Sequence, residues 1–218
     1  MVNQSTPWVV FSLAAVLIVC ACGAVGERHV AESAGSGDLA PALWEPSRAQ
    51  SEVGAVAAQV LAALMQRDIR AVAVWVHSTR GVRLSPYAFV APDEHVRFSP
   101  VGLVEAWSDP APRVWGHDDA TGEAIELTLP EYLERFVWDG EYADGSDIGY
   151  NTRVGQGNTV DNAAEIYADG VAVEYHLPGT EPELEGMDWK SLRLVLARDE
   201  RQDEAWRLVA IIHDQWTP

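Results

Sequence analysis

Residue types suited to acid–base chemistry or anion binding gather in the last third of the sequence. Alternation along a predicted strand places Glu174 and His176 on one face. Arg193 lies on the next predicted strand, and His213 lies on the last one, where alternation groups it with Val209. If these faces converge, the four polar side chains line one patch in an otherwise apolar sheet.

Three residues earlier in the domain are expected to approach this patch from the helix end: His77, Arg83 and Tyr87. A histidine beside a carboxylate can exchange protons near neutral pH, and an arginine can clamp an anion with its planar fork. The same residue types also form buried networks that satisfy a polar core. The sequence leaves a ligand pocket, a catalytic centre and a structural network open.

Other chemistries have less support in the sequence. Glu174, His176 and His213 are of metal-ligating types, but no HExxH or CxxC spacing accompanies them. The acidic loop from Asp139 to Asp147 departs from the EF-hand spacing, and there is no GxSxG motif. We therefore expect no bound metal, no cofactor and no catalytic triad.

Apolar periodicity predicts the elements that must position these residues. Ser47 and Thr128 each have capping-box spacing, Asp68 is expected to cap the second helix, and Gly81 is well placed to break it. Residues 139–157 are predicted to form a loop. Helices are predicted over residues 47–66, 68–77, 99–107 and 128–137, and strands over 82–90, 113–117, 124–127, 163–167, 171–176, 189–197 and 206–214.

This order of elements predicts the fold class. Helices come first and mostly antiparallel strands follow, which is typical of an α+β domain with N-terminal helices packed on a curved, mainly antiparallel, cone-like sheet. The chain has 218 residues, enough for one such domain. Its formal net charge of −18 repels phosphate backbones, so we expect no nucleic-acid partner.

The N-terminal segment predicts export and lipidation. Residues 8–19 form an apolar run of the length of a signal-peptide core, which is too short to span a membrane comfortably. Cys22 follows the small residue Ala21, with apolar Val19 two positions further back, as a lipoprotein signal requires. Cys20 follows a bulkier residue, so Cys22 is the better candidate for lipidation.

These features divide the chain into a signal peptide (1–21), a flexible tether (22–46) and a globular domain (47–218). Lipid on Cys22 would anchor the domain to a membrane of the cell envelope, facing outside the cytoplasm. If the cell has two membranes, we expect the periplasm or the outer membrane.

Four segments resemble signatures of an uncharacterised family of bacterial lipoproteins. They are 81–87 (GVRLSPY), 148–151 (IGYN), 186–196 (GMDWKSLRLVL) and 206–217 (WRLVAIIHDQWT). The resemblance implies an envelope location. The order of elements is also similar to the nuclear-transport-factor-2-like, or cystatin-like, α+β cone, which implies a pocket at its open end; that fold carries enzymes and binding proteins alike.

The leading hypothesis is a non-catalytic envelope lipoprotein that binds a small ligand or an envelope protein. The alternatives are an enzyme that uses His/Glu acid–base chemistry in a cone pocket, and a structural or wall-associating module. The tryptophans of the domain would give the last of these a surface for stacking on glycans.

Overall fold

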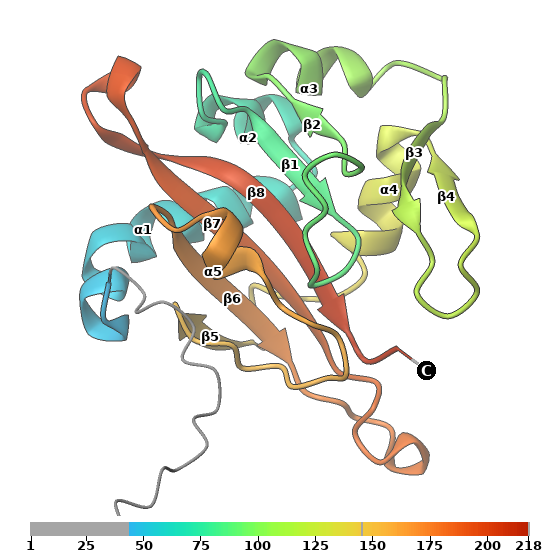
Figure 1. Ribbon diagram of the computed structural model, residues 1–218. Helices are drawn as coiled ribbons and strands as arrows, with labels where there is room; N and C mark the ends of the chain where they lie inside the picture. The colour runs from blue at the N-terminus through green and yellow to red at the C-terminus, as the bar shows by residue number, and fades with distance from the viewer. Residues whose placement is uncertain (1–43, 145, 218) are drawn as a thin grey trace, which may run out of the picture. The chain divides into compact units, whose positions relative to one another are not determined.

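The computed structural model describes residues 44–144 and 146–217 (Figure 1). The helices are α1 (Pro46–Met65), α2 (Ile69–Trp75), α3 (Pro100–Ala106), α4 (Leu129–Phe136) and α5 (Ala163–Ile166), with short 3-10 turns at Pro182–Leu184 and Glu200–Gln202. The strands are β1 (Val82–Ser85), β2 (Arg97–Phe98), β3 (Arg113–His117), β4 (Ala124–Leu127), β5 (Asp147–Tyr150), β6 (Val171–Leu177), β7 (Lys190–Asp199) and β8 (Ala205–Gln215).

Six of these strands form one sheet in the order β2-β1-β8-β7-β6-β5, and β3 and β4 form a separate hairpin. The long β7–β8 hairpin lies at the centre, and β1 pairs with β8 in parallel, whereas the other pairings are antiparallel. Helices pack against this sheet. The predicted α+β class, with helices on a curved and mainly antiparallel sheet, is confirmed.

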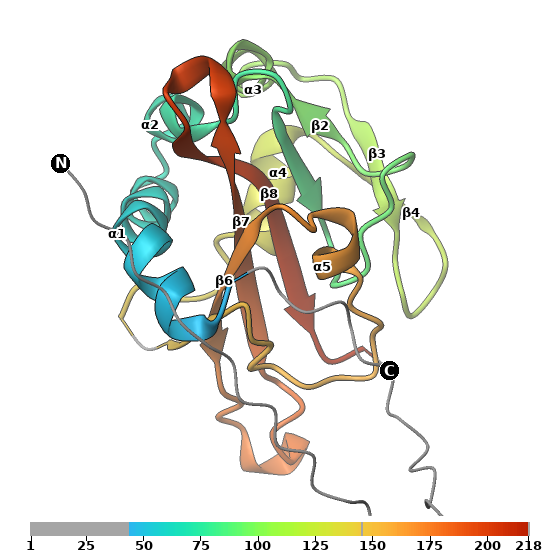
Figure 2. The same cartoon turned by 60° about the vertical axis from the view of Figure 1, so that its left-hand side comes forward.

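The sheet separates two layers. One face packs against α1, whose buried Val53, Val60 and Leu64 join the main core with Leu192 and Ile211 of the central strands. The other face packs against α5 through a smaller apolar cluster, which includes Ala163, Val195 and Ile212. Figure 2 shows α1 and α5 on opposite sides of the sheet. Polar residues on the α5 side are therefore isolated from the larger apolar core.

The predicted helix-start signals have different outcomes. The Asp68 side chain accepts from two backbone amides of α2, and the capping box of Thr128 and Glu131 is formed. The box predicted at Ser47 is wrong, because α1 begins one residue earlier, at Pro46. Proline suits the first helical turn, where its missing N–H has no carbonyl to bond.

Three predicted strand and loop assignments are corrected. Residues 163–167 form the helix α5 and its end rather than a strand, and the predicted loop 139–157 contains β5. The extended segment 82–90 is regular only as far as Ser85. The outcomes depend on contacts with distant segments, because β5 pairs with β6, α5 packs on the sheet and β1 pairs with β2 and β8, and local propensity does not determine such contacts.

The predicted signal peptide, tether and lipidation residue Cys22 lie outside the described residues, except for the last three residues of the tether. Among the residues described, no helix has both the length and the apolar character needed to cross a bilayer.

Candidate functional site

The Glu174–Arg193 pair lies in the middle of the sheet, on the α5 side. The two residues are register partners on β6 and β7, and their exposed fractions are 1% and 2%. Arg193 Nη2 and Nε donate to Glu174 Oε2 over 3.0 and 3.3 Å, and Arg193 Nη1 donates to Asp161 Oδ2 over 2.9 Å. Alternation along both strands accounts for their shared face.

The other oxygen of Glu174 is also bonded within the fold. Oε1 accepts from the Gly155 amide and from the Ser191 hydroxyl, each over 2.8 Å. Because that hydroxyl donates to Glu174, it accepts from His176 Nδ1, which lies 2.9 Å away. Both carboxylate oxygens are thus occupied and buried. This arrangement is typical of a structural network, with no position on Glu174 left for a substrate.

His213 lies on the opposite face of the sheet from Glu174, so the predicted convergence is wrong. A β-bulge makes Val209 an extra residue, because Val195 pairs with Ala210 whereas the next residue of β7 pairs with Leu208. One extra residue reverses the alternation on the rest of the strand. His213 consequently faces the main core and packs edge-on against a phenylalanine of α4.

Both ring nitrogens of His213 face acceptors. Nε2 lies 3.1 Å from Asp139 Oδ2, and Nδ1 lies 3.2 Å from the Pro86 carbonyl oxygen. Lys190 Nζ also lies 3.0 Å from Asp139 Oδ2. Burial raises the pKa of Asp139, but the hydrogen bonds and charges of His213 and Lys190 outweigh burial and hold this pKa at about 2.

Replacing Asp139 with asparagine is expected to lower the free energy of unfolding at pH 6 by about 2 kcal/mol. A depressed carboxyl pKa contributes stability above the ordinary value of 3.8, and this contribution is lost as the pH falls through about 2. Urea denaturation at pH 6, 4 and 2 should show the difference between the two proteins shrinking toward pH 2. The exposed neighbour Glu141→Gln serves as the control. A difference that stays constant with pH would contradict the assignment.

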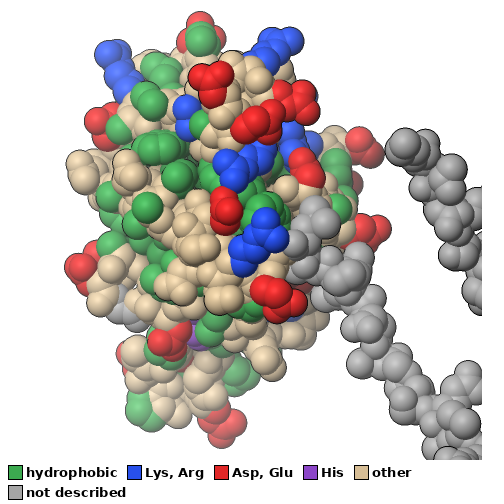
Figure 3. Space-filling view, turned by 90° about the vertical axis from the view of Figure 1, so that its left-hand side faces the viewer, with side chains coloured by type: hydrophobic (Ala, Val, Ile, Leu, Met, Phe, Trp, Pro, Cys, Tyr) green, Lys and Arg blue, Asp and Glu red, His purple; other side chains and the backbone are tan. Residues whose placement is uncertain are grey.

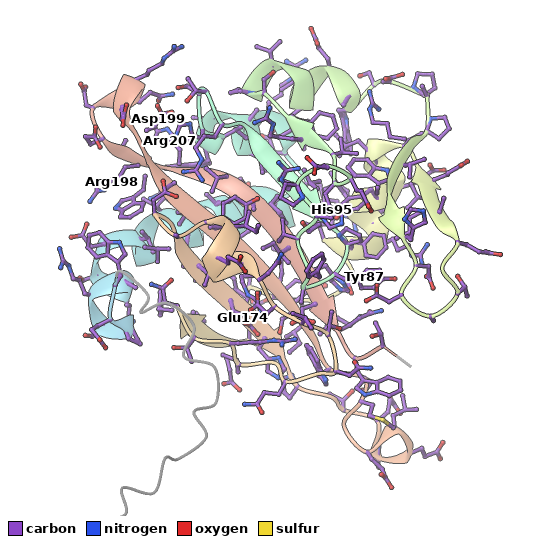
Figure 4. All side chains as sticks on the ribbon, in the orientation of Figure 1. Tyr87, His95, Glu174, Arg198, Asp199 and Arg207 are labelled. Carbon is purple, nitrogen blue, oxygen red and sulfur yellow. The ribbon has the colours of Figure 1, made fainter. Side chains whose placement is uncertain are left out.

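Two more of the predicted residues lie away from Glu174. The Tyr87 hydroxyl points to Asp118, and its ring packs edge-on against Phe136 of α4. His77 lies beside Asp199, where Nδ1 accepts from two backbone amides and Nε2 donates to the carbonyl of Arg198. Figure 4 shows Glu174 in the middle of the sheet and Asp199 at its far end. The seven predicted residues therefore do not form one site.

Arg83, in contrast, lines a hollow of about 180 Å³ on the α5 side. Arg83 of β1 is the register partner of Arg97 of β2, so the two side chains extend from directly opposed backbone positions on the same face of the sheet. Arg80, in the turn before β1, is the third cation of the hollow. We call this hollow the arginine pocket; its lining residues are Arg80, Arg83, Arg97, Ile166, Tyr167 and Val209.

Each of the three arginines of the pocket is held through one nitrogen of its guanidinium group, Nη1. Arg83 Nη1 donates to two backbone carbonyls, at Pro92 and His95, and Arg97 Nη1 donates to the carbonyl of Arg80. Arg80 Nη1 forms an ion pair over 2.6 Å with an exposed aspartate, Asp169. Within residues 44–144 and 146–217, neither Arg83 nor Arg97 forms a salt bridge, and besides these carbonyls Arg83 lies within hydrogen-bonding reach of the Tyr167 hydroxyl.

The Tyr167 hydroxyl is a buried polar group of the arginine pocket with incomplete hydrogen bonding. Tyr167 has an exposed fraction of 7%, and its Oη has no hydrogen bond of normal geometry to any residue that the structure describes. Burial raises the pKa of Tyr167, while the charge of Arg83, a side-chain hydrogen bond with Arg83 and the charges of Arg80 and Arg97 act to lower it. A buried hydroxyl whose bonding is incomplete costs stability unless a ligand or water completes it.

Six other arginines of the domain are paired with carboxylates, whereas Arg207 is bonded to the neutral side chain of Gln202. Figure 3 shows one face of the molecule, on which basic side chains lie next to acidic ones. The paired arginines include Arg67, Arg113, Arg135, Arg153, Arg193 and Arg198. The arginine pocket thus combines three cations with one exposed carboxylate in a strongly acidic protein.

Sequence reasoning missed Arg80, Arg97 and Tyr167. No local pattern marks them, because Arg97 lies on a strand of two residues and Tyr167 was predicted on a strand. His95, which lies behind Arg83, has its pKa lowered to about 4 by burial and by Arg83, so it is neutral at pH 7. Across the described residues, no group of three His, Cys, Asp or Glu side chains is arranged to hold a metal.

Two solved structures are similar to this chain. Aln2 from a Streptomyces species has 12% identity over 76% of this chain and 88% of its own, with a TM-score of 0.34. A ketosteroid isomerase-like protein from Erwinia carotovora atroseptica has 15% identity over 77% of this chain and 96% of its own, also with a TM-score of 0.34. No protein-family model and no curated protein matches the sequence.

Proposed function

We propose that this chain is a lipid-anchored protein of the cell envelope whose domain binds a small anionic ligand in the arginine pocket. The observation that carries the proposal is the direct opposition of Arg83 and Arg97 across two strands, with no carboxylate between them. Like charges in directly opposed positions destabilise a sheet. A protein keeps such an arrangement when a bound group of opposite charge compensates for it, which makes the pair a candidate for function.

The chemistry of the pocket supports an anion of the phosphate, sulfate or carboxylate class. Guanidinium groups present parallel N–H donors that match the oxygens of these anions. Arg83 and Arg97 would supply most of these donors, and the Tyr167 hydroxyl would add one from the buried side. Arg80 is held by Asp169, whose side chain is 65% exposed, so that ion pair costs little to rearrange.

Replacing Arg83 with glutamine is expected to weaken anion binding at least tenfold, because a charge-assisted hydrogen bond contributes about 1.5–3 kcal/mol. Titration calorimetry with inorganic phosphate and sulfate, in a buffer without other anions of this class, measures the affinity. Arg113→Gln, which removes an arginine paired with Asp109, is the matched control and should bind as the unmodified protein does. Equal affinities for the two variants, or no binding by the unmodified protein, would refute the proposal.

The anchor is tested separately. Mass spectrometry of the protein isolated from its own cells should show cleavage before Cys22 and acylation of that cysteine. Replacing Cys22 with serine should release the domain from the membrane fraction. An uncleaved and unmodified N-terminus in the cytosolic fraction would contradict the envelope location, while leaving the arginine pocket untouched.

A further inference from the structure

A second hollow, of about 350 Å³, adjoins the arginine pocket. Arg80 lines both hollows and so joins them, whereas its partner Asp169 lines only the second one. We call the second hollow the polar groove; its lining residues are His77, Thr79, Arg80, Asp169, Arg198, Asp199, Glu200 and Arg201. It lies at the end of the sheet marked by Asp199 and Arg198 in Figure 4.

The sizes of the two hollows indicate different roles. Pockets for whole small molecules have volumes of roughly 300–1,000 Å³. The arginine pocket, at about 180 Å³, is below that range and suits a single anionic group. The polar groove, at about 350 Å³, falls within it. A ligand that places its anionic group among the arginines therefore has room for its remaining part in the groove.

Two buried residues that line the groove, Asp199 and His77, have their polar atoms bonded within the fold. Asp199, which is fully buried, accepts from the amide and hydroxyl of Ser78 over 2.7 and 2.9 Å and from the amide of Arg201. His77 is bonded on both ring nitrogens. These residues shape the groove and leave no polar atom of their own to contact a ligand.

The rim of the groove offers both donors and acceptors. In the part of the chain that the structure describes, the side chains of Glu200 and Arg201 form no hydrogen bond or ion pair, and Asp169 is bonded only to Arg80. Thr79 also lines the groove, and its hydroxyl makes a long contact of 3.4 Å with His77 Nδ1. Carboxylates beside hydroxyl and guanidinium donors match a ligand whose hydroxyl groups both donate and accept.

We infer, on the basis of the proposed function, that the ligand is a phosphorylated polyol or sugar. Its phosphate would bind Arg80, Arg83 and Arg97, and its hydroxyl groups would bind the rim of the polar groove. Arg80 contacts both hollows, so it is the residue at which the phosphate and the polyol would join. Glu200 would accept hydrogen bonds from the hydroxyl groups and contribute nothing to the phosphate.

Titration calorimetry on the full chain tests this inference with three probes: inorganic phosphate, glucose 6-phosphate and glucose. We expect glucose 6-phosphate to bind at least tenfold more tightly than phosphate, and glucose alone to show no measurable binding. Glu200→Ala, which removes the hydrogen-bond acceptor, should remove this tenfold gain and leave the affinity for phosphate unchanged. Glu204→Ala, in the same β7–β8 turn but outside the groove, is the control and should keep the gain.

The outcomes separate the two proposals. Equal affinities for phosphate and glucose 6-phosphate would overturn the inference about the groove, while the anion site would stand. Loss of the tenfold gain in both Glu200→Ala and Glu204→Ala would also overturn it, because the effect would then be one of general charge. Absence of phosphate binding would instead overturn the proposed function on which the inference rests.

Discussion

Replacing Arg193 with methionine is expected to lower the free energy of unfolding by about 3–5 kcal/mol, because it leaves Glu174 buried without a countercharge. Arg193 is 2% exposed and bonds both Glu174 and Asp161. Removing one charged residue of such a network leaves its partner unpaired in the protein interior, where charge is poorly solvated. Urea denaturation at pH 7, followed by tryptophan fluorescence, measures the change.

Two comparisons distinguish this account from a general loss of packing. Arg198→Met removes an arginine that forms an ion pair with Glu52, and the exposed fractions of these two side chains are 40% and 33%. Because such a pair is solvated, its loss should lower the free energy of unfolding by no more than about 1 kcal/mol. The double variant Glu174→Leu with Arg193→Met should recover part of the loss, since Glu174 is then no longer left as a buried carboxylate without a countercharge, while the buried Asp214 keeps its ion pair with Arg153. A double variant less stable than Arg193→Met alone would contradict the explanation.

Replacing Gly81 with alanine is expected to destabilise the fold by about 3 kcal/mol and to abolish anion binding. The φ angle of Gly81 is +66°, which costs a residue with a Cβ roughly 1–2 kcal/mol. An added Cβ would also lie 2.2 Å from the Phe98 carbonyl oxygen, so the backbone of β2 would have to move. Overpacking of this kind adds about 1–3 kcal/mol. The displaced segments carry Arg80, Arg83 and Arg97.

Gly122→Ala is the matched control for this prediction. Gly122 has a similar φ of +73°, but an added Cβ would have no heavy atom within 4 Å among the described residues. It should therefore show only the conformational cost and retain anion binding. Thermal denaturation and phosphate titration of both variants measure the two effects. Equal losses of stability would show that the contact with Phe98 is unimportant.

The sequence predicted much of the scaffold. Asp68, Thr128 and Glu131 act at helix starts where their side chains satisfy nearby backbone amides, so a few neighbouring residues are sufficient to predict them. Alternation placed Glu174 and His176 on one strand face because consecutive side chains of a strand always point to opposite sides. The order of helices followed by strands indicated the α+β class, because the period of apolar residues along each segment is likewise a property of neighbouring residues.

The candidate site depended on contacts that no local pattern records. The bulge at Val209 reversed the face of His213, and whether a strand bulges is decided by the strand beside it. Arg83 meets Arg97 only because β1 pairs with both β2 and β8, and Tyr167 joins them only because α5 packs on that face. Local hydrogen bonding and side-chain period are properties of neighbouring residues and are readable from the sequence. The approach of distant strands depends on how the whole core packs, so only the tertiary structure brings three arginines and a buried tyrosine together.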